Sequence, residues 1–362
     1  MGGLEYVDVY VNTEGLYQPL TRSYGNIGIV GTCLSGSDNE VEQWTSPIDE
    51  EAVHASGDLV NAVSDAFANG ALRVFTVKST SDSETDMYAA LSKLASEDVQ
   101  LVLYAGQPAT VANTASGSTL YGLFKTHVLN ASAAGRTRMG IIMLASGADT
   151  SDMDTVVSNM TSERMVLLAH HSSSDIAACA AGVISYREPP TSMTLKPIVC
   201  EQTEEYSDTD LATIVDLHII PVTVPLYYSG NGEVMGKNFT LDGSGTRKYI
   251  DIVRTIDDVV FSLKAGLTSP KVMGNFRMNL VGMRLLYSEV AGILNYKKTQ
   301  KYLDDYRINI PLLNLLERTN RTDAETATMN QIINSLIATV EVDIIYRGAL
   351  ESLIINVNFV PS

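Results

Sequence analysis

The glycines of residues 25–31, Gly-Asn-Ile-Gly-Ile-Val-Gly, have a spacing that a phosphate-binding loop could use. Such a loop needs a tight turn that opens directly into the N-terminus of a helix. Here Gly28 and Gly31 lie inside an apolar run, and Leu34-Ser-Gly-Ser-Asp-Asn follows in place of a helix. We therefore expect these glycines to allow close packing between a strand and a helix, and not to bind a nucleotide.

The pair His170-His171, followed by Asp175, is the arrangement that most resembles a metal site. Adjacent side chains on a strand point to opposite faces, so two neighbouring histidines rarely share one ion. His54, His127 and His218 have no ligand spacing. The sequence therefore predicts no metal and no cofactor.

The remaining candidates for catalysis do not form a site in the sequence. Cys33, Cys179 and Cys200 are odd in number and far apart, which is typical of small buried residues in a reducing compartment. No Gly-x-Ser-x-Gly motif joins a strand to a helix. Asp257-Asp258 and Asp304-Asp305 are adjacent pairs that we expect on solvated faces. We predict no catalytic residue and no enzymatic activity.

The densest basic region comprises Lys297, Lys298 and Lys301, with Arg307, Arg318 and Arg321 downstream. The lysines end a predicted helix, where cations interact favourably with the helix dipole. Contact with an acidic protein surface is the alternative, and both interpretations stay open at this point.

The net charge of −17 is unevenly distributed along the chain. Residues 1–240 carry 29 acidic and 11 basic residues, whereas residues 241–362 carry 13 acidic and 14 basic residues. The first part suits a solvated outer domain, and the second suits contact with a partner. Nucleic acid is not expected as a partner, because its binding requires clustered cations. Membrane insertion is not expected either, because no apolar run approaches the ~18 residues of a membrane span.

Strand and helix patterns alternate between residues 26 and 186, which predicts an α/β domain with a mostly parallel sheet covered on both faces. Residues 191–240 are less regular and suit extended segments at a sheet edge. Two amphipathic helices follow, with apolar residues at helical spacing over 250–267 and 280–294. A polar helix near 324–336 then leads to a strand at 339–346, which predicts a C-terminal α+β domain.

Both ends of the chain have the period-two pattern of strands. Val7, Val9 and Val11 alternate with polar or aromatic residues near the start, and Leu353, Ile355, Val357 and Phe359 alternate near the end. Termini usually fray unless a partner holds them. We expect these strands to add to a sheet, either in this chain or in a neighbouring copy.

Three segments resemble the contractile tail sheath proteins of phage tails and related injection systems. They are Arg247–Val259, which resembles the start of the family's C-terminal domain, residues 57–74, which resemble its first helix, glycine and strand, and Ala133–Ile141. The order of the segments and the apolar strand at the end of the chain support the resemblance.

The resemblance implies a structural protein that polymerises as stacked hexameric rings around an inner tube and contracts to drive that tube through a target envelope. It implies a domain organisation of an N-terminal arm (1–24), an outer α/β domain (25–240), an inner sheath domain (241–348) and a C-terminal arm strand (349–362). The arms would join a neighbour's sheet, and Lys297, Lys298 and Lys301 would face the tube.

By the same resemblance, the partners are other copies of the chain, the inner tail tube protein, and the baseplate and tail terminator proteins. The location would be a virion tail or injection particle assembled in the host cytoplasm. Two alternatives remain at this stage: an α/β nucleotide-binding enzyme, and another lattice-forming or tube-forming tail component.

Overall fold

The computed structural model describes residues 25–225, 232–243, 245, 247–269, 272–346 and 348–349. These residues belong to two compact units. The larger unit contains the described residues of 25–258, with 298–305 and 344–349, and the smaller unit contains those of 259–297 and 306–343. The predicted arm strands around residues 7–11 and 353–360 lie outside the described residues.

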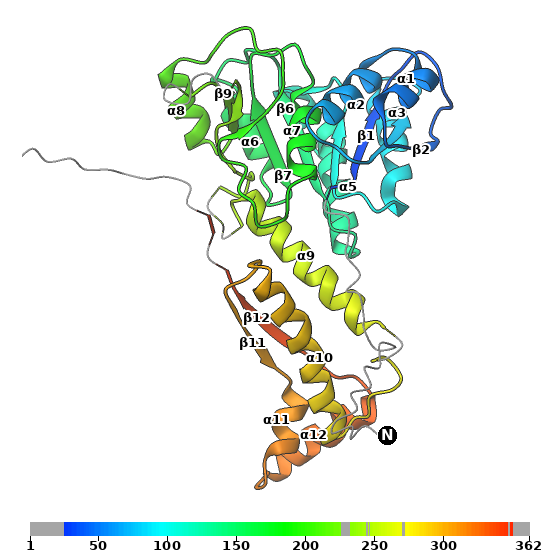
Figure 1. Cartoon of the computed structure of the whole chain (residues 1–362), viewed down its shortest axis with the longest axis vertical. Helices are drawn as coiled ribbons and strands as arrows, with labels where there is room; N and C mark the ends of the chain where they lie inside the picture. Colours follow the sequence, from blue (N-terminus) through cyan, green and yellow to red (C-terminus); the bar gives the residue numbers. More distant parts are fainter. Residues whose placement is uncertain are drawn as a thin grey trace, which may run out of the picture. The chain divides into compact units, whose positions relative to one another are not determined.

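The larger unit is built on a ten-stranded sheet in the order β2-β3-β1-β4-β6-β7-β9-β10-β8, with β5 paired to β6 (Figure 1). The strands are β1 (Ile27–Gly31), β2 (Val41–Trp44), β3 (Val74–Lys78), β4 (Leu101–Tyr104), β5 (Pro108–Ala109), β6 (Met139–Leu144), β7 (Met165–Ala169), β8 (Lys196–Pro197), β9 (Ile220–Thr223) and β10 (Val234–Met235).

The centre of this sheet is parallel, because β3, β1, β4, β6, β7 and β9 pair in the same direction. Residue Ile27 of β1 is in register with Val74 on one side and Leu101 on the other. All residues of β1, β4, β6 and β7 are buried, as expected for strands covered on both faces. β2 and β10 pair antiparallel to their neighbours at the two sides. The prediction of a mixed α/β domain is confirmed.

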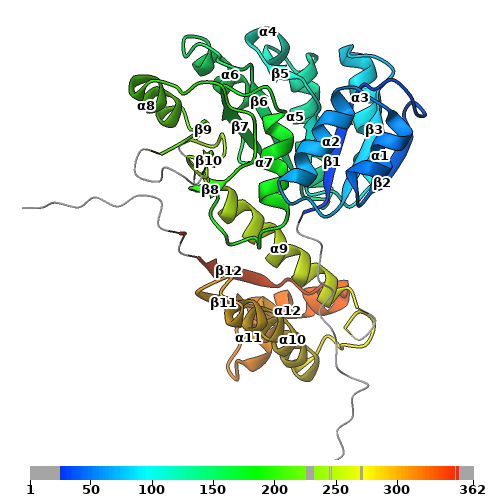
Figure 2. The same ribbon diagram turned by 45° about the horizontal axis from the view of Figure 1, so that its top comes forward.

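Helices cover both faces of the sheet (Figures 1 and 2). One core cluster joins the sheet to α2 and α7, and the other joins it to α3, α5 and α6. The helices of the sheet domain are α1 (Pro47–His54), α2 (Asp58–Ala68), α3 (Glu84–Lys93), α4 (Val111–Thr114), α5 (Leu120–Ala133), α6 (Met153–Met160), α7 (Ile176–Ser185) and α8 (Asp208–Asp216).

Helix α7 is unusual because all ten of its residues are buried. Its alanines and Gly182 allow close contact with α2: a Cβ atom on Gly182 would lie 2.4 Å from the backbone oxygen of Ala66. The side chain of Asp175 begins the helix by accepting a hydrogen bond from the backbone N–H of Ala178. Close helix packing therefore explains the small residues of this segment.

The region 191–240 differs in part from the prediction of extended segments. β8 and β10 do pair near the edge of the sheet, but residues 208–216 form α8. The N-cap Ser207, which accepts from the N–H of Asp210, and the acidic first turn are start signals that the apolar pattern alone did not reveal. The short elements β2 and α1 were also not predicted.

The C-terminal region forms the two amphipathic helices, the polar helix and the strand near 339–346 that the sequence predicts, and also a strand at 305–309 and a short helix at 311–317 that it does not predict. α9 (Ile250–Leu267) begins in the larger unit, and α10 (Leu280–Thr299), β11 (Asp305–Asn309), α11 (Pro311–Glu317), α12 (Asp323–Ser335) and β12 (Glu341–Ile345) follow. Among the described residues, no helix is long and apolar enough to cross a membrane.

Candidate assembly surface

β11 and β12 form a two-stranded sheet, and no third strand pairs with it among the described residues (Figure 1). The N–H of Asp304 donates to Ile345 O at 2.9 Å, and the side-chain amide of Asn309 donates to Glu341 at 2.5 Å. The start of β11 therefore lies beside the end of β12, as in an antiparallel pair. Such a sheet has two open edges that can pair with a further strand.

The side chains of this sheet alternate between two environments. The half-buried face contains Tyr306, Ile308, Val342 and Ile344, and the hydroxyl of Tyr306 donates to Ala291 O of α10 at 3.4 Å. The other side chains are exposed. One face is thus packed and the register is fixed, while the backbone at the edges stays available.

The smaller unit exposes many large apolar side chains for its size. α12 has no buried residue, although a complete capping box between Thr322 and Glu325 defines its start. The exposed apolar residues of this unit are Met273, Val281, Leu285, Tyr287, Tyr296, Leu336 and Ile337. Apolar side chains gathered on a small unit are typical of an interaction surface.

The three lysines predicted to face a tube occupy different environments. Lys297 is 6 % exposed, whereas Lys298 and Lys301 are exposed. Lys298 forms an ion pair with Asp305 at 2.9 Å, and Lys301 follows the end of α10 with φ of +63°. Contact with a tube stays a prediction. Because Lys297 is buried, only Lys298 and Lys301 of the three are exposed enough to make such a contact.

The glycines of β1 have the packing role that we expected. A Cβ atom on Gly28 would lie 2.8 Å from Leu94 Cδ1, and one on Gly31 would lie 2.7 Å from the Cβ of Ala105. The loop that follows leads to β2 and not to a helix N-terminus. The glycine spacing therefore reflects dense packing around β1.

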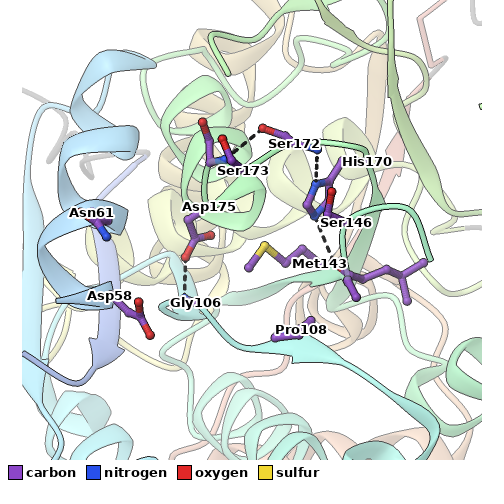
Figure 3. Close-up of a pocket in the computed structure, with 13 residues that line it drawn as sticks. Asp58, Asn61, Gly106, Pro108, Met143, Ser146, His170, Ser172, Ser173 and Asp175 are labelled. Atoms are coloured by element: carbon purple, nitrogen blue, oxygen red, sulfur yellow. Dashed lines mark hydrogen bonds between the residues drawn. The ribbon is translucent and has the colours of Figure 1, made fainter. Parts of the chain in front are cut away.

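A cavity of about 320 Å³ lies where the parallel strands end (Figure 3). Open α/β sheets often bind ligands at such positions. The residues that line it include Asp58 and Asp175. Among the described residues, no Lys or Arg lines the cavity. Burial raises the pKa of Asp175 to about 6, although its carboxylate accepts from the N–H groups of Gly106 and Ala178. This lining does not favour a nucleotide phosphate.

The histidine pair belongs to the protein's own hydrogen bonds. His170 Nε2 lies 3.0 Å from Leu144 O, and His170 Nδ1 accepts from the N–H of Ser172. Burial lowers the pKa of His170 to about 4, so this imidazole is neutral at pH 7. His171 packs edge-on against Tyr206. Within the described residues, no group of three or more His, Cys, Asp or Glu side chains could hold a metal ion.

The cysteines are free thiols in the structure. Cys179 is buried, and Cys33 and Cys200 are half-buried. Burial raises the pKa of Cys33 to about 11 and that of Cys200 to about 12. These thiols are protonated at neutral pH, which does not favour a nucleophilic role.

The expectation of a solvated face for Asp257-Asp258 is wrong. Asp257 forms a bidentate ion pair with Arg164, and Asp258 is only 5 % exposed. Arg254 is also buried, and its pKa falls to about 10 because burial outweighs the nearby acidic groups. The helical pattern could not reveal the pairing of Asp257, because Arg164 lies 93 positions earlier in the sequence.

No profile of a known protein family matches this chain, and no curated protein does. Solved structures do match it. The sheath complex of the extracellular contractile injection system PVC, in its contracted state, has a TM-score of 0.70 at 15 % identity, covering 99 % of this chain and 98 % of that chain.

Two further solved structures agree with this match. A chain of the anti-feeding prophage baseplate has a TM-score of 0.67 at 12 % identity, covering 99 % of both chains. The sheath tail protein of Desulfitobacterium hafniense has a TM-score of 0.62 at 10 % identity, covering 84 % of this chain and 93 % of that chain. These neighbours are parts of sheath and baseplate assemblies or sheath tail proteins. The chain therefore has the fold of the contractile tail sheath proteins.

Proposed function

We propose that this chain is the structural subunit of a contractile sheath. The observation that carries the proposal is the match of its fold to a contracted sheath over 99 % of the chain. In this function the subunits assemble as stacked hexameric rings around an inner tube, and contraction drives the tube through a target envelope. The particle is a virion tail or an injection machine assembled in the host cytoplasm, with baseplate and terminator proteins at its ends.

The two-stranded sheet supports the part of this proposal that concerns linkage between subunits. In this proposal the strands predicted at 7–11 and 353–360 of neighbouring copies would add to the edges of the β11–β12 sheet. A strand that adds ~5 backbone hydrogen bonds, each worth about 1 kcal/mol net, holds neighbours together. Contacts of this head-to-tail kind build open helical polymers.

Electron microscopy of the purified protein tests the proposal. We expect tubes or stacked rings from the full chain, and folded monomers after deletion of residues 350–362. Circular dichroism of the truncated protein provides the control for folding. Normal polymers from the truncated chain would contradict the arm linkage, and a different subunit arrangement would favour another lattice-forming tail component.

A nucleotide-binding enzyme is the alternative that the α/β sheet suggests. The acidic lining of the cavity at the strand ends does not favour it. A thermal-shift screen with nucleotides and dinucleotides measures this directly, and we expect no saturable shift in melting temperature.

A further inference from the structure

Tyr346, the residue directly after β12, is fixed by a buried carboxylate. Its hydroxyl donates to Asp251 Oδ2 at 2.5 Å. Asp251 lies in the first turn of α9 and is 1 % exposed, and both residues belong to the larger unit. The chain is thus held at the point from which it continues toward the predicted arm strand at Leu353.

The position of Asp251 is itself determined by the sheet domain. The side-chain amide of Asn238, which is fully buried, donates to Asp251 Oδ1 at 2.6 Å. Asn238 Oδ1 accepts from the backbone N–H of Met193 at 3.1 Å, and Asn238 O accepts from the N–H of Ile250. Both carboxylate oxygens are therefore used, one toward the sheet domain and one toward Tyr346.

Positive charge near this carboxylate comes from Arg254, one turn further along α9. Arg254 is 6 % exposed, and its NH2 nitrogen donates a hydrogen bond to Arg187 O, with 2.7 Å between the two atoms. Asp251 and Asp258 interact electrostatically with this guanidinium. A buried group with several fixed partners keeps one geometry, because each lost contact leaves an unsatisfied polar atom.

The hydrogen bond of Tyr346 is partly buried and has a charged acceptor, which makes it stronger than an exposed neutral bond. The phenol of Tyr346 is half-buried, and burial together with the bond to Asp251 raises its pKa far above the ordinary value. The phenol is therefore protonated at neutral pH and can donate this hydrogen bond. Hydrogen bonds to charged acceptors are about twice as strong as neutral ones.

We propose that the Tyr346–Asp251 hydrogen bond is a positioning contact that fixes the start of the C-terminal arm to the first turn of α9. The proposal rests on the sheath function proposed above. Its consequence is mechanical: a pull on the arm reaches the sheet domain through Asp251 and Asn238, and not only through the pairing of β12. The linkage then starts from the same fixed point in every copy, which a regular polymer needs.

The test compares Tyr346→Phe with Tyr306→Phe in the full chain. Tyr306 is a matched control, because its hydroxyl also makes a partly buried hydrogen bond next to the same two-stranded sheet. Hydrogen exchange of the unassembled subunit is measured by mass spectrometry over residues 341–346 and 250–255. Loss of a bond to a charged group predicts about tenfold to hundredfold faster exchange near Tyr346. Tyr306→Phe leaves these two segments at wild-type rates.

The second measurement is the protein concentration at which polymers form, followed by sedimentation and electron microscopy. We expect Tyr346→Phe to need at least about tenfold more protein, with a melting temperature equal to that of Tyr306→Phe. Unchanged exchange near Tyr346, or normal polymerisation despite faster exchange, would overturn the proposal. Failure of the sheath function is seen separately, because the wild-type chain itself would then form no tubes.

Discussion

At the scale of single residues, the molecule depends on buried charges whose partners are distant in sequence. Arg138 is fully buried, and its NH1 group lies 3.2 Å from Leu94 O and 2.9 Å from His127 Nε2. Carbonyl groups at the end of a helix carry negative partial charge and favour a cation there. His127 must be neutral to accept from this guanidinium. Burial and the charge of Arg138 lower the pKa of His127 to about 4.

Acid should therefore destabilise the protein through His127. Its pKa is lower in the folded state than the usual 6.5, so proton binding favours the unfolded state. The loss in the free energy of unfolding that comes from His127 is absent above about pH 7. It grows as the pH falls to 4 and is about 2 kcal/mol at pH 5. Urea unfolding at pH 7.5 and 5 measures it. His127→Gln keeps an acceptor for Arg138 without a titrating group, so between pH 7.5 and 5 it should lose about 2 kcal/mol less stability than the wild type. Equal losses in the two proteins would show that His127 is not the group responsible.

The ion pair between Arg164 and Asp257 gives a second prediction at this scale. Their side chains are 9 % and 13 % exposed. Removing one partner leaves a buried charge, so Asp257→Ala should cost about 3–5 kcal/mol in the free energy of unfolding. The double variant with Arg164→Ala should cost less than the two single costs together, by about 0.5–3 kcal/mol. Denaturant unfolding of all four proteins measures this coupling, and strictly additive costs would count against it.

At the scale of elements, the two-stranded sheet has backbone groups at its edge that a further strand could pair with. Ile345 O points toward β11, because it accepts from the N–H of Asp304. Backbone groups of successive strand residues point to alternate sides, so the N–H groups of Val342 and Ile344 point to the open edge. In the proposed linkage, the backbone N–H groups of Val342 and Ile344 would therefore donate hydrogen bonds to the added strand.

Val342→Pro should therefore block polymer formation while the unit remains folded. Proline removes the N–H at the open edge, where strands tolerate it, and leaves the pairing with β11. Val342→Ala is the matched control, since it shortens the same side chain but keeps the N–H. Negative-stain microscopy and circular dichroism give the two readouts. Equal assembly of both variants would show that this edge is not the linkage.

Two exposed lysines, Lys298 and Lys301, lie in the last turn of α10 and shortly after it. Lys298→Glu with Lys301→Glu should prevent assembly around the particle's tube protein, because the proposed contact is with an acidic surface. Lys93→Glu with Arg73→Glu makes the same charge change on exposed residues of the sheet domain. Co-sedimentation with tubes should separate the two double variants, and similar behaviour would remove the lysines from the tube contact.

At the scale of the whole molecule, the net charge of −17 opposes close association of many copies. Residues 1–240 account for this charge, and the remaining residues are nearly neutral. Many carboxylates lie in the first turns of helices, where they interact favourably with the helix dipole, as in α1, α3 and α8. These first-turn carboxylates stabilise their own helices, whereas the net charge disfavours crowding of copies.

Assembly should consequently be favoured by salt. The Debye length falls from about 30 Å at 0.01 M to about 10 Å at 0.1 M, which screens repulsion between neighbouring copies. Light scattering during a salt titration should show polymers forming at lower protein concentration as sodium chloride rises over this range. Assembly that weakens with salt would instead indicate attractive charge pairs as the main contacts.

Elements with a local pattern can be predicted from the order of residues. The burial of β1, β4, β6 and β7 follows from their continuous apolar runs, and the spacing of apolar residues identified α9 and α10. The order of three segments, together with the apolar pattern at the end of the chain, predicts the sheath fold that the solved structures show. Short elements such as β2 and α8 were missed, because few residues carry their pattern.

The pairing of buried polar residues depends on how the chain folds in three dimensions. Asp257 and Asp258 have the sequence pattern of a solvated helix face, yet Arg164, 93 positions earlier, pairs with Asp257. The same is true of Asp251 and Tyr346, which are 95 positions apart. The physical reason is that periodicity reports the average polarity of a face, whereas a buried charge depends on one partner that only the folded chain brings close.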